Sequence, residues 1–394
     1  MAVKGNFFAE KREWSKLKDQ ILDEYLTPYL AKILKTGRPT RIADCFAGKG
    51  KFDDGTPGSP LIIARHIAEQ QTRNPAADLR GIFIERKYVA DLRANLAPFE
   101  SCEVLPDDYE HCVQHFLSRP RNVERNYFFY VDPYGIKCLN FAYFQQLKAV
   151  GFKSLEILLN LNTTGFLREG CRMLRYTREL PDWATDLDYE RDSKNTPTRM
   201  DAIAGGDYWQ DILSDFEKGT LAFNEAEERF TGEYARRLRA ILPFVVNVPI
   251  KDRSHRLPKY RLIFATNHHA GLFLMTDTMN KAWRTLLTRE SGGQLFLFND
   301  EQWTNTSGPS IEAKIWDETA ISTELAALLI RLIEKHGIAH STSEYSTAIR
   351  KHEGTMFQVQ RDPDTTLTGL KARHLDYNRA RIVVKRLPYA EEFL

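Results

Sequence analysis

Apolar and polar positions follow two different periods along the chain. Residues 7–35 carry apolar side chains at spacings of three and four, among them Leu17, Ile21 and Tyr25. This spacing predicts one long amphipathic helix, in which Pro28 favours a kink. From residue 41 onward, short apolar runs alternate with helical patterns.

The alternating part predicts a parallel sheet. Short apolar runs predict buried strands, and the intervening segments have helical periodicity. Strands separated by helices of this length form βαβ units with right-handed crossovers. The predicted strands are 41–46, 79–84, 102–105, 127–131 and 154–161, and the predicted helices are 60–71, 89–99, 109–119 and 140–150.

Residues 165–240 are mostly polar and predict a helical insertion. Two apolar runs follow, at 241–250 and 260–275, and the charged turn between them predicts an antiparallel hairpin at the sheet's edge. Five parallel strands ending in such a hairpin are typical of the class I methyltransferase sheet, a doubly wound Rossmann-type α/β fold. A Rossmann dehydrogenase would not normally end this way.

The last 80 residues predict three short helices and a strand. Three short helices followed by a strand fit a small winged-helix-like unit, and a mixed cap packed on the main domain fits them equally well; the helices are 321–336, 341–352 and 365–375, and the strand is 381–386. The expected domains are a helical lead-in over 1–40, a main domain over 41–290, a linker over 291–320 and the C-terminal unit over 321–394.

Composition and charge narrow the class of protein. A chain that is 42% hydrophobic and 27% charged is an ordinary globular protein, and the formal net charge of +2 confines any nucleic-acid-binding surface to a local patch. Basic clusters at 236–239 and 251–261 could form one, although solvated helices explain them nearly as well. No run approaches 18 apolar residues and the N-terminus lacks an apolar leader region, so we expect a soluble, cytoplasmic protein without membrane contact.

Cysteine and histidine give no sign of a metal site. Adjacent His268 and His269 would point to opposite faces of a strand, which suits a loop end better than a shared ligand set. The cysteines form no C-x-x-C pair, which argues against a disulfide framework and a structural zinc site; they are Cys45, Cys102, Cys112, Cys138 and Cys171.

A glycine-rich loop follows the first predicted strand. It reads D-C-F-A-G-K-G and contains Asp44, Phe46, Gly48 and Gly50. Glycines let the backbone approach a nucleoside, and a carboxylate at the strand's end can accept a hydrogen bond from the ligand. The loop lacks the G-x-G-x-x-G of a pyrophosphate cradle, so it favours S-adenosylmethionine (SAM) over a dinucleotide. A plain tight turn is the alternative.

Acidic residues also end the second and third predicted strands. Glu85 is positioned to bind both ribose hydroxyls of the cofactor, or else it remains solvated beside its basic neighbours. After the third strand, Asp107 or Asp108 would accept a hydrogen bond from the adenine amino group, and either could instead cap a helix that begins at Tyr109.

The fourth predicted strand ends in Asp132-Pro133-Tyr134-Gly135, where the catalytic residues of an amino-directed methyltransferase are expected. There Asp132 would accept a hydrogen bond from the exocyclic amine, Pro133 would fix the backbone, and Tyr134 would stack on the flipped base. A bare D-P-Y-G is also a common turn sequence.

Three further residues are weaker candidates. Asn162 and Arg168 follow the fifth strand and could contact substrate, although a strand-end turn explains the asparagine equally well. Lys18, on the first predicted helix, could reach the methionine carboxylate of SAM.

Several of these motifs resemble the three-Cys-motif partner (TcmP) family over roughly residues 7–290. The stretches that carry the resemblance are Phe7 to Leu26, Asp44 to Pro60, Ile84 to Lys87, Val131 to Gly135 and Tyr260 to Met275. The resemblance implies a divergent SAM-dependent methyltransferase associated with a separate protein that bears a three-cysteine motif.

The loop Pro57 to Pro60 is also similar to that of RlmJ-type ribosomal-RNA adenine-N6 methyltransferases. Those enzymes have D-P-P-Y where this chain has D-P-Y-G, which is closer to the D-P-F-G of tRNA guanine-N2 methyltransferases. The target base therefore stays open. The sequence also leaves the oligomeric state open.

Two functions from different classes fit the sequence. The first is a SAM-dependent N-methyltransferase that acts on an exocyclic amine of RNA or DNA. The second is a SAM-binding partner or specificity subunit of a three-cysteine-motif protein, without methyl transfer of its own.

Overall fold

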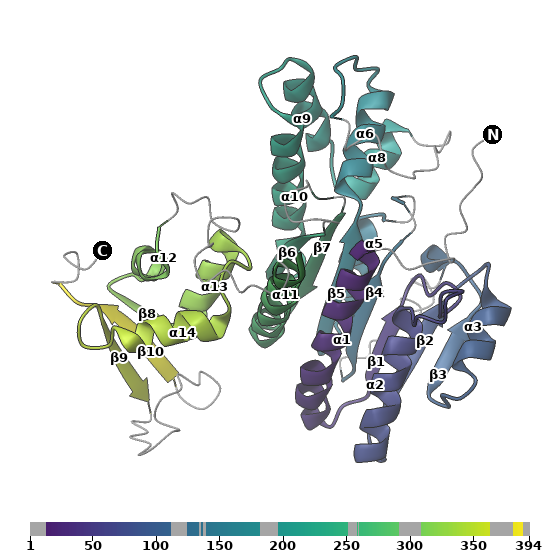
Figure 1. The fold of residues 1–394 in the computed structure, drawn as a ribbon, viewed down its shortest axis with the longest axis horizontal. Coiled ribbons are helices and arrows are strands. Elements are labelled where there is room, and N and C mark those ends of the chain that lie inside the picture. Colours follow the sequence, from purple (N-terminus) through teal and green to yellow (C-terminus); the bar gives the residue numbers. More distant parts are fainter. Residues whose placement is uncertain are drawn as a thin grey trace. The chain divides into compact units, whose positions relative to one another are not determined.

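The computed structural model describes residues 13–111, 124–133, 135–136, 139–181, 196–250, 258, 260–290, 309–362 and 381–388. The chain divides into two compact units, Met1–His268 and His269–Leu394, and each contains one sheet (Figure 1). The predicted main domain was expected to run to residue 290. The helix that ends there, α11 (His269–Glu290), groups instead with the second unit.

The first unit is built on a seven-stranded sheet in the order β3-β2-β1-β4-β5-β7-β6. β1 to β5 are parallel, β7 is antiparallel to β5, and β6 is antiparallel to β7. This confirms the predicted Rossmann-type doubly wound sheet with a terminal antiparallel hairpin. The strands are β1 (Thr40–Asp44), β2 (Leu79–Ile84), β3 (Cys102–Leu105), β4 (Asn126–Val131), β5 (Ser154–Leu161), β6 (Phe244–Ile250) and β7 (Tyr260–Thr266).

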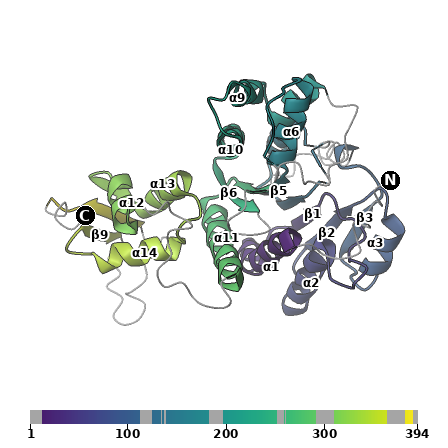
Figure 2. The ribbon, with the colours of Figure 1, turned by 45° about the horizontal axis from the view of Figure 1, so that its top comes forward.

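Helices cover both faces of this sheet. α1 and α2 lie side by side on one face, and α6, α9 and α10 lie on the other (Figure 2). The helices of the unit are α1 (Glu13–Ile33, continued by the short 3₁₀ turn Leu34–Thr36), α2 (Ser59–Arg73), α3 (Val89–Leu96), α5 (Ala142–Val150), α6 (Thr163–Met173), α8 (Pro197–Ala204), α9 (Tyr208–Glu217) and α10 (Phe223–Arg239). The last four form the predicted helical insertion.

Alternation along the strands decides what each face contacts, since successive side chains point to opposite sides. Tyr127, Phe129 and Val131 of β4 belong to the large core cluster formed with α5 and the insertion. The side chain of Phe128 points to the opposite face of the sheet and stacks on Tyr25 of α1, with ring centroids 5.7 Å apart. The amphipathic N-terminal helix is therefore a layer of the fold rather than a separate lead-in.

A buried hydrogen bond also ties α1 to the sheet. The Tyr25 hydroxyl donates to Glu156 Oε2 of β5 at 2.7 Å, and both side chains are inaccessible to solvent. Burial raises the pKa of Glu156 to about 7, although the Tyr25 hydrogen bond opposes this rise.

The predicted strand run 260–275 was wrong in its second half. The strand ends at Thr266, and α11 begins at His269. Asn267 marks the change, because its side-chain oxygen accepts a hydrogen bond from Leu155 N in the neighbouring strand. Both segments are buried, and periodicity alone does not separate a buried strand from a buried helix.

After its first helix, the second unit has an order of elements that is compatible with the winged-helix-like unit, which remains a prediction. A helix and a short strand precede two helices and two further strands, and the sheet order is β8-β10-β9, all antiparallel. The elements are α11, α12 (Ile311–Glu318), β8 (Ser322–Glu324), α13 (Leu325–His336), α14 (Thr342–Lys351), β9 (Phe357–Asp362) and β10 (Arg381–Arg386).

Three details of this unit differ from the sequence prediction. α12 lies within the expected linker, where Ser310 caps it by accepting a hydrogen bond from Ala313 N. The expected helix 321–336 begins as strand β8, and β9 was not predicted. The expected helix 365–375 lies outside the described residues.

Among the described helices, none is long and apolar enough to span a membrane.

We expect Glu156→Gln to change how stability depends on pH. Glu156 is protonated in the folded state up to about pH 7, whereas in the unfolded chain it ionises near its ordinary pKa. The folded wild type therefore loses stability as pH rises through this window. Chemical denaturation at pH 5 and pH 8 should show the variant gaining about 2 kcal/mol relative to wild type over the interval. Exposed Glu103→Gln is the control, and an equal response in both variants would contradict the buried role.

Candidate functional site

The carboxyl ends of β1 to β4 meet at one edge of the first sheet, because these strands are parallel and in register. Asp44 pairs with Phe83 on one side and with Tyr130 on the other. The predicted site residues that end these four strands therefore come from neighbouring strands along a single edge. This is the position at which doubly wound sheets bind their ligands.

Asp44 is completely buried at the end of β1. Its Oδ1 accepts a hydrogen bond from Phe46 N at 3.2 Å, whereas its Oδ2 has no hydrogen-bond partner within the described part of the chain. Burial raises the pKa of this carboxyl to about 7, Ser59 and the Phe46 amide oppose the rise, and the charges of Asp132 and Asp19 add to it. A buried carboxylate oxygen without a donor is suited to a cationic or hydrogen-bond-donating ligand.

The glycine-rich loop folds around Glu85. Gly48 and Gly50 have φ of +60° and +89°, which residues with a Cβ rarely adopt. Gly48 N donates to Glu85 Oε2 at 2.9 Å, and the amides of Lys87 and Tyr88 donate to Oε1.

Glu85 thus joins the loops that follow β1 and β2. A carboxylate accepts about four hydrogen bonds, so three backbone amides leave room for about one ribose hydroxyl rather than two. The alternative of an ion pair with Arg86 does not describe the structure, because the Arg86 guanidinium lies 2.9 Å from Asp108.

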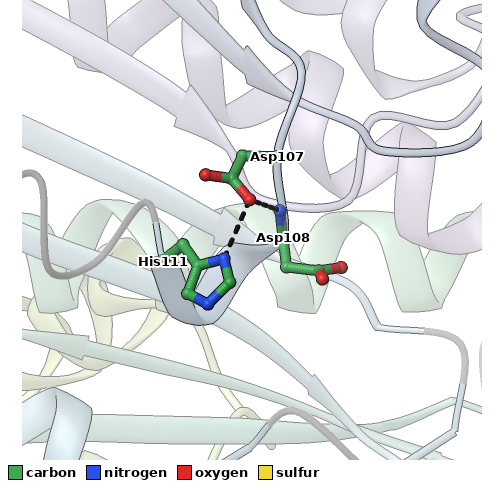
Figure 3. Close-up of side chains that lie close together, drawn as sticks. All are labelled: Asp107, Asp108 and His111. Carbon is green, nitrogen blue, oxygen red and sulfur yellow. Dashed lines mark hydrogen bonds and ion pairs between the residues drawn. The ribbon is translucent and has the colours of Figure 1, made fainter.

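Asp107, Asp108 and His111 lie together at the end of β3 (Figure 3). Asp107 Oδ1 accepts from Asp108 N at 2.7 Å and lies 3.0 Å from His111 Nδ1. This hydrogen bond lowers the pKa of Asp107 and raises that of His111. Asp107 is therefore occupied by the Asp108 amide and by His111, and Asp108 pairs with Arg86.

One candidate ligand atom from each of these three residues lies within 4.8 Å of the others, a spacing that a metal ion would also require. Each group already has a partner in the chain, so the cluster is explained without an ion. Beside it, the ring of Phe46 lies 5.3 Å from that of buried Tyr109, so the loop after β1 packs on the start of this helix.

Asp132 is surrounded by hydrogen-bond donors. Its Oδ2 lies 2.6 Å from Lys18 Nζ and 3.3 Å from the Tyr130 hydroxyl, and its Oδ1 accepts from Asn160 Nδ2 at 2.7 Å. About a quarter of the Asp132 side chain is exposed. Pro133 beside it is buried.

Lys18, the candidate for the methionine carboxylate of SAM, pairs with Asp132. Its side chain is 7% exposed, and its ammonium lies 5.6 Å from the centre of the Tyr260 ring. The ammonium forms a nearly buried ion pair with the predicted catalytic carboxylate, which brings the N-terminal helix into the site.

The other two weaker candidates follow β5. Asn162 is buried and caps α6, since its Oδ1 accepts from Gly165 N at 2.8 Å, as the strand-end turn alternative supposes. Arg168 lies on α6 and is half-buried. Tyr134, the predicted stacking residue, lies outside the described residues.

Sequence reasoning missed Tyr130 and Asn160. Tyr130 stands two positions before Asp132 on β4 and shares its face. Asn160 interrupts the otherwise apolar end of β5, and its own Oδ1 is buried and has no hydrogen-bond partner among the residues that the structure describes. A polar residue in a strand buried along its whole length was the available sign of a site.

Comparison with known proteins gives likeness of fold alone. No known family model matches the chain, and no curated protein matches it in sequence. The crystal structure of LPL1258 from Legionella pneumophila str. Philadelphia 1, assigned to family DUF519, is 11% identical with a TM-score of 0.36 and covers 69% of this chain and 92% of its own. SCL7 of Oryza sativa is 12% identical with a TM-score of 0.27, over 64% and 83% of the two chains.

We expect Asp132→Ala to destabilise the first unit, because it leaves the buried Lys18 ammonium unpaired. The loss should be about 2–4 kcal/mol. The double variant Lys18→Met/Asp132→Ala removes both charges and should recover at least about 1 kcal/mol of this loss in denaturant titrations. Additive effects of the two substitutions would show that the ion pair contributes nothing to the fold.

Proposed function

We propose that this chain is a SAM-dependent N-methyltransferase that acts on an exocyclic amine of a nucleic-acid base. The observation that carries the proposal is the convergence of Asp44, Glu85 and Asp132 at the carboxyl edge of a sheet with the order 3-2-1-4-5-7-6. That order, with its antiparallel last strand, is typical of class I methyltransferases. The motif resemblance to the TcmP family points the same way.

The residues at this edge fit the cofactor in chemical type. The unpartnered Oδ2 of Asp44 can accept from the α-ammonium of SAM. Glu85 can accept from a ribose hydroxyl while holding the glycine loop in place. Asp108 remains for the adenine amino group, although Arg86 shares it, whereas Asp107 is occupied by the Asp108 amide and His111.

When bound, SAM supplies an electrophilic methyl group on its sulfonium. Asp132 then receives a hydrogen bond from the substrate amine and directs the nitrogen lone pair toward that methyl group. The Asp132 carboxylate would stabilise the positive charge that methyl transfer from the sulfonium places on this nitrogen, whose proton would then leave to solvent. Asn160 and Tyr130 keep the carboxylate oriented by donating to it.

A second function is favoured by one observation. Both oxygens of Asp132 already have donors, and the Lys18 ammonium lies where an amine would bind. If Asp132 accepts only from these donors of its own chain, it does not orient a substrate amine. The chain would then act as a SAM-binding partner subunit, for example of a three-cysteine-motif protein.

Cofactor affinity should depend on the ionisation of Asp44. This carboxyl must be ionised to hold an ammonium, and its pKa lies at about 7, so protonation below neutral pH should weaken binding. Calorimetric SAM affinity should rise about eightfold from pH 6 to pH 7.5. In Asp44→Asn it should be weaker and nearly independent of pH over this range. A wild-type affinity that falls as pH rises would contradict the assignment.

Asp132→Asn should separate binding from catalysis. The amide keeps an acceptor for Lys18 but loses the charge that stabilises the transition state, so SAM affinity should stay within about threefold of wild type. Transfer of tritiated methyl from SAM to unmodified DNA and RNA should fall at least about a hundredfold. Asp211→Asn, at an exposed position of α9 outside the proposed site, is the matched control. A folded Asp132→Asn variant with undiminished transfer would refute the role, and an inactive wild type that binds SAM would favour the second function.

A further inference from the structure

The second unit contains a helix-turn-helix. α13 ends at His336, Gly337 with φ of +62° begins the turn, and α14 starts at Thr342. One face of α14 is buried in the unit through Thr342, Tyr345 and Ile349. In motifs of this kind, the second helix presents its outer face to a ligand.

α14 is fixed firmly at its N-terminus. Ser341 and Glu344 form a capping box. Asp277 of α11 accepts from both the amide and the hydroxyl of Thr342, at 2.6 and 2.7 Å, and Arg284 of α11 lies 2.8 Å from Glu344. A helix held in this way can present side chains without a large loss of conformational entropy on binding.

The outer face of α14 carries hydroxyls and cations. Ser343, Thr347 and Lys351 are exposed at steps of four residues, and half-buried Arg350 lies beside them. The one carboxylate of the helix, Glu344, is taken up by Arg284. Next along the chain, Gln358 and Gln360 are exposed on β9.

We propose that α14 binds the major groove of double-stranded DNA. The cations of Arg350 and Lys351 suit the phosphate backbone. The hydroxyls of Ser343 and Thr347 and the amides of Gln358 and Gln360 suit base edges. An α-helix with side chains is about 10–12 Å across, which matches a B-form major groove of about 12 Å, whereas the deep, narrow groove of A-form RNA does not admit it. The proposal names duplex DNA as the macromolecule that the second unit binds, and it does not depend on methyl transfer.

The test uses the full chain without SAM, so that its outcome is independent of catalysis. Binding of a fluorescently labelled duplex of about 24 base pairs is followed by anisotropy between 50 and 200 mM salt. Arg350→Ala/Lys351→Ala should weaken binding at least about tenfold at 100 mM salt and reduce the log–log salt slope by about two. The melting temperature should not change, because these side chains lie on the outer face.

The control removes the same charge from the first unit. Lys35→Ala/Arg73→Ala takes away two exposed cations and should change affinity less than about twofold. Equal losses in both double variants, an unchanged Arg350→Ala/Lys351→Ala variant, or equal affinity for duplex RNA of the same sequence would each overturn the proposal. If the protein binds DNA as expected but transfers no methyl group, the proposed function fails and the proposed DNA-binding surface is kept.

Discussion

Carboxylates gathered at one sheet edge impose the electrostatic constraint on which the site depends. Parallel strands end together, so Asp44 and Asp132 lie near each other; burial disfavours the ionisation of Asp44 most, and the charge of Asp132 adds to this effect. Two features of the structure reduce the repulsion between these carboxylates. Asp132 receives the ammonium of Lys18, and Asp44 has a raised pKa that leaves it partly protonated at neutral pH.

This constraint makes helix α1 part of the site as well as part of the fold. The face of the helix that carries Lys18 also carries Tyr25, seven residues later, which donates to buried Glu156. Stacking of Tyr25 on Phe128 fixes the helix over β4, the strand that ends at Asp132. Displacement of α1 would therefore uncover the core and remove the counter-ion of Asp132 together.

The sequence predicted the elements of the first unit well because its strands are short and bounded by turn residues, and most of them are buried. β2, β3 and β5 begin and end where expected. The prediction failed at Thr266, where a buried strand is followed directly by a buried helix. It also failed at the short helix α12, for which the capping residue Ser310 is the main sequence signal. Periodicity reports which face is buried but not which element type buries it.

For the site, residue types at strand ends were predictable and their partners were not. The positions of Asp44, Glu85 and Asp132 followed from the strand pattern. The pairing of Lys18 with Asp132 joins residues 114 positions apart, and the donors to Glu85 are backbone amides that have no sequence pattern. Whether a carboxylate is free for a ligand therefore required coordinates.

The most direct test of the account is the choice of ligand at this edge. Calorimetry of the wild-type chain at pH 7.5 should show SAM binding with a dissociation constant near 1 μM, on the order of −8 kcal/mol, and no heat with NAD. Clear binding of NAD together with none of SAM would contradict the central claim.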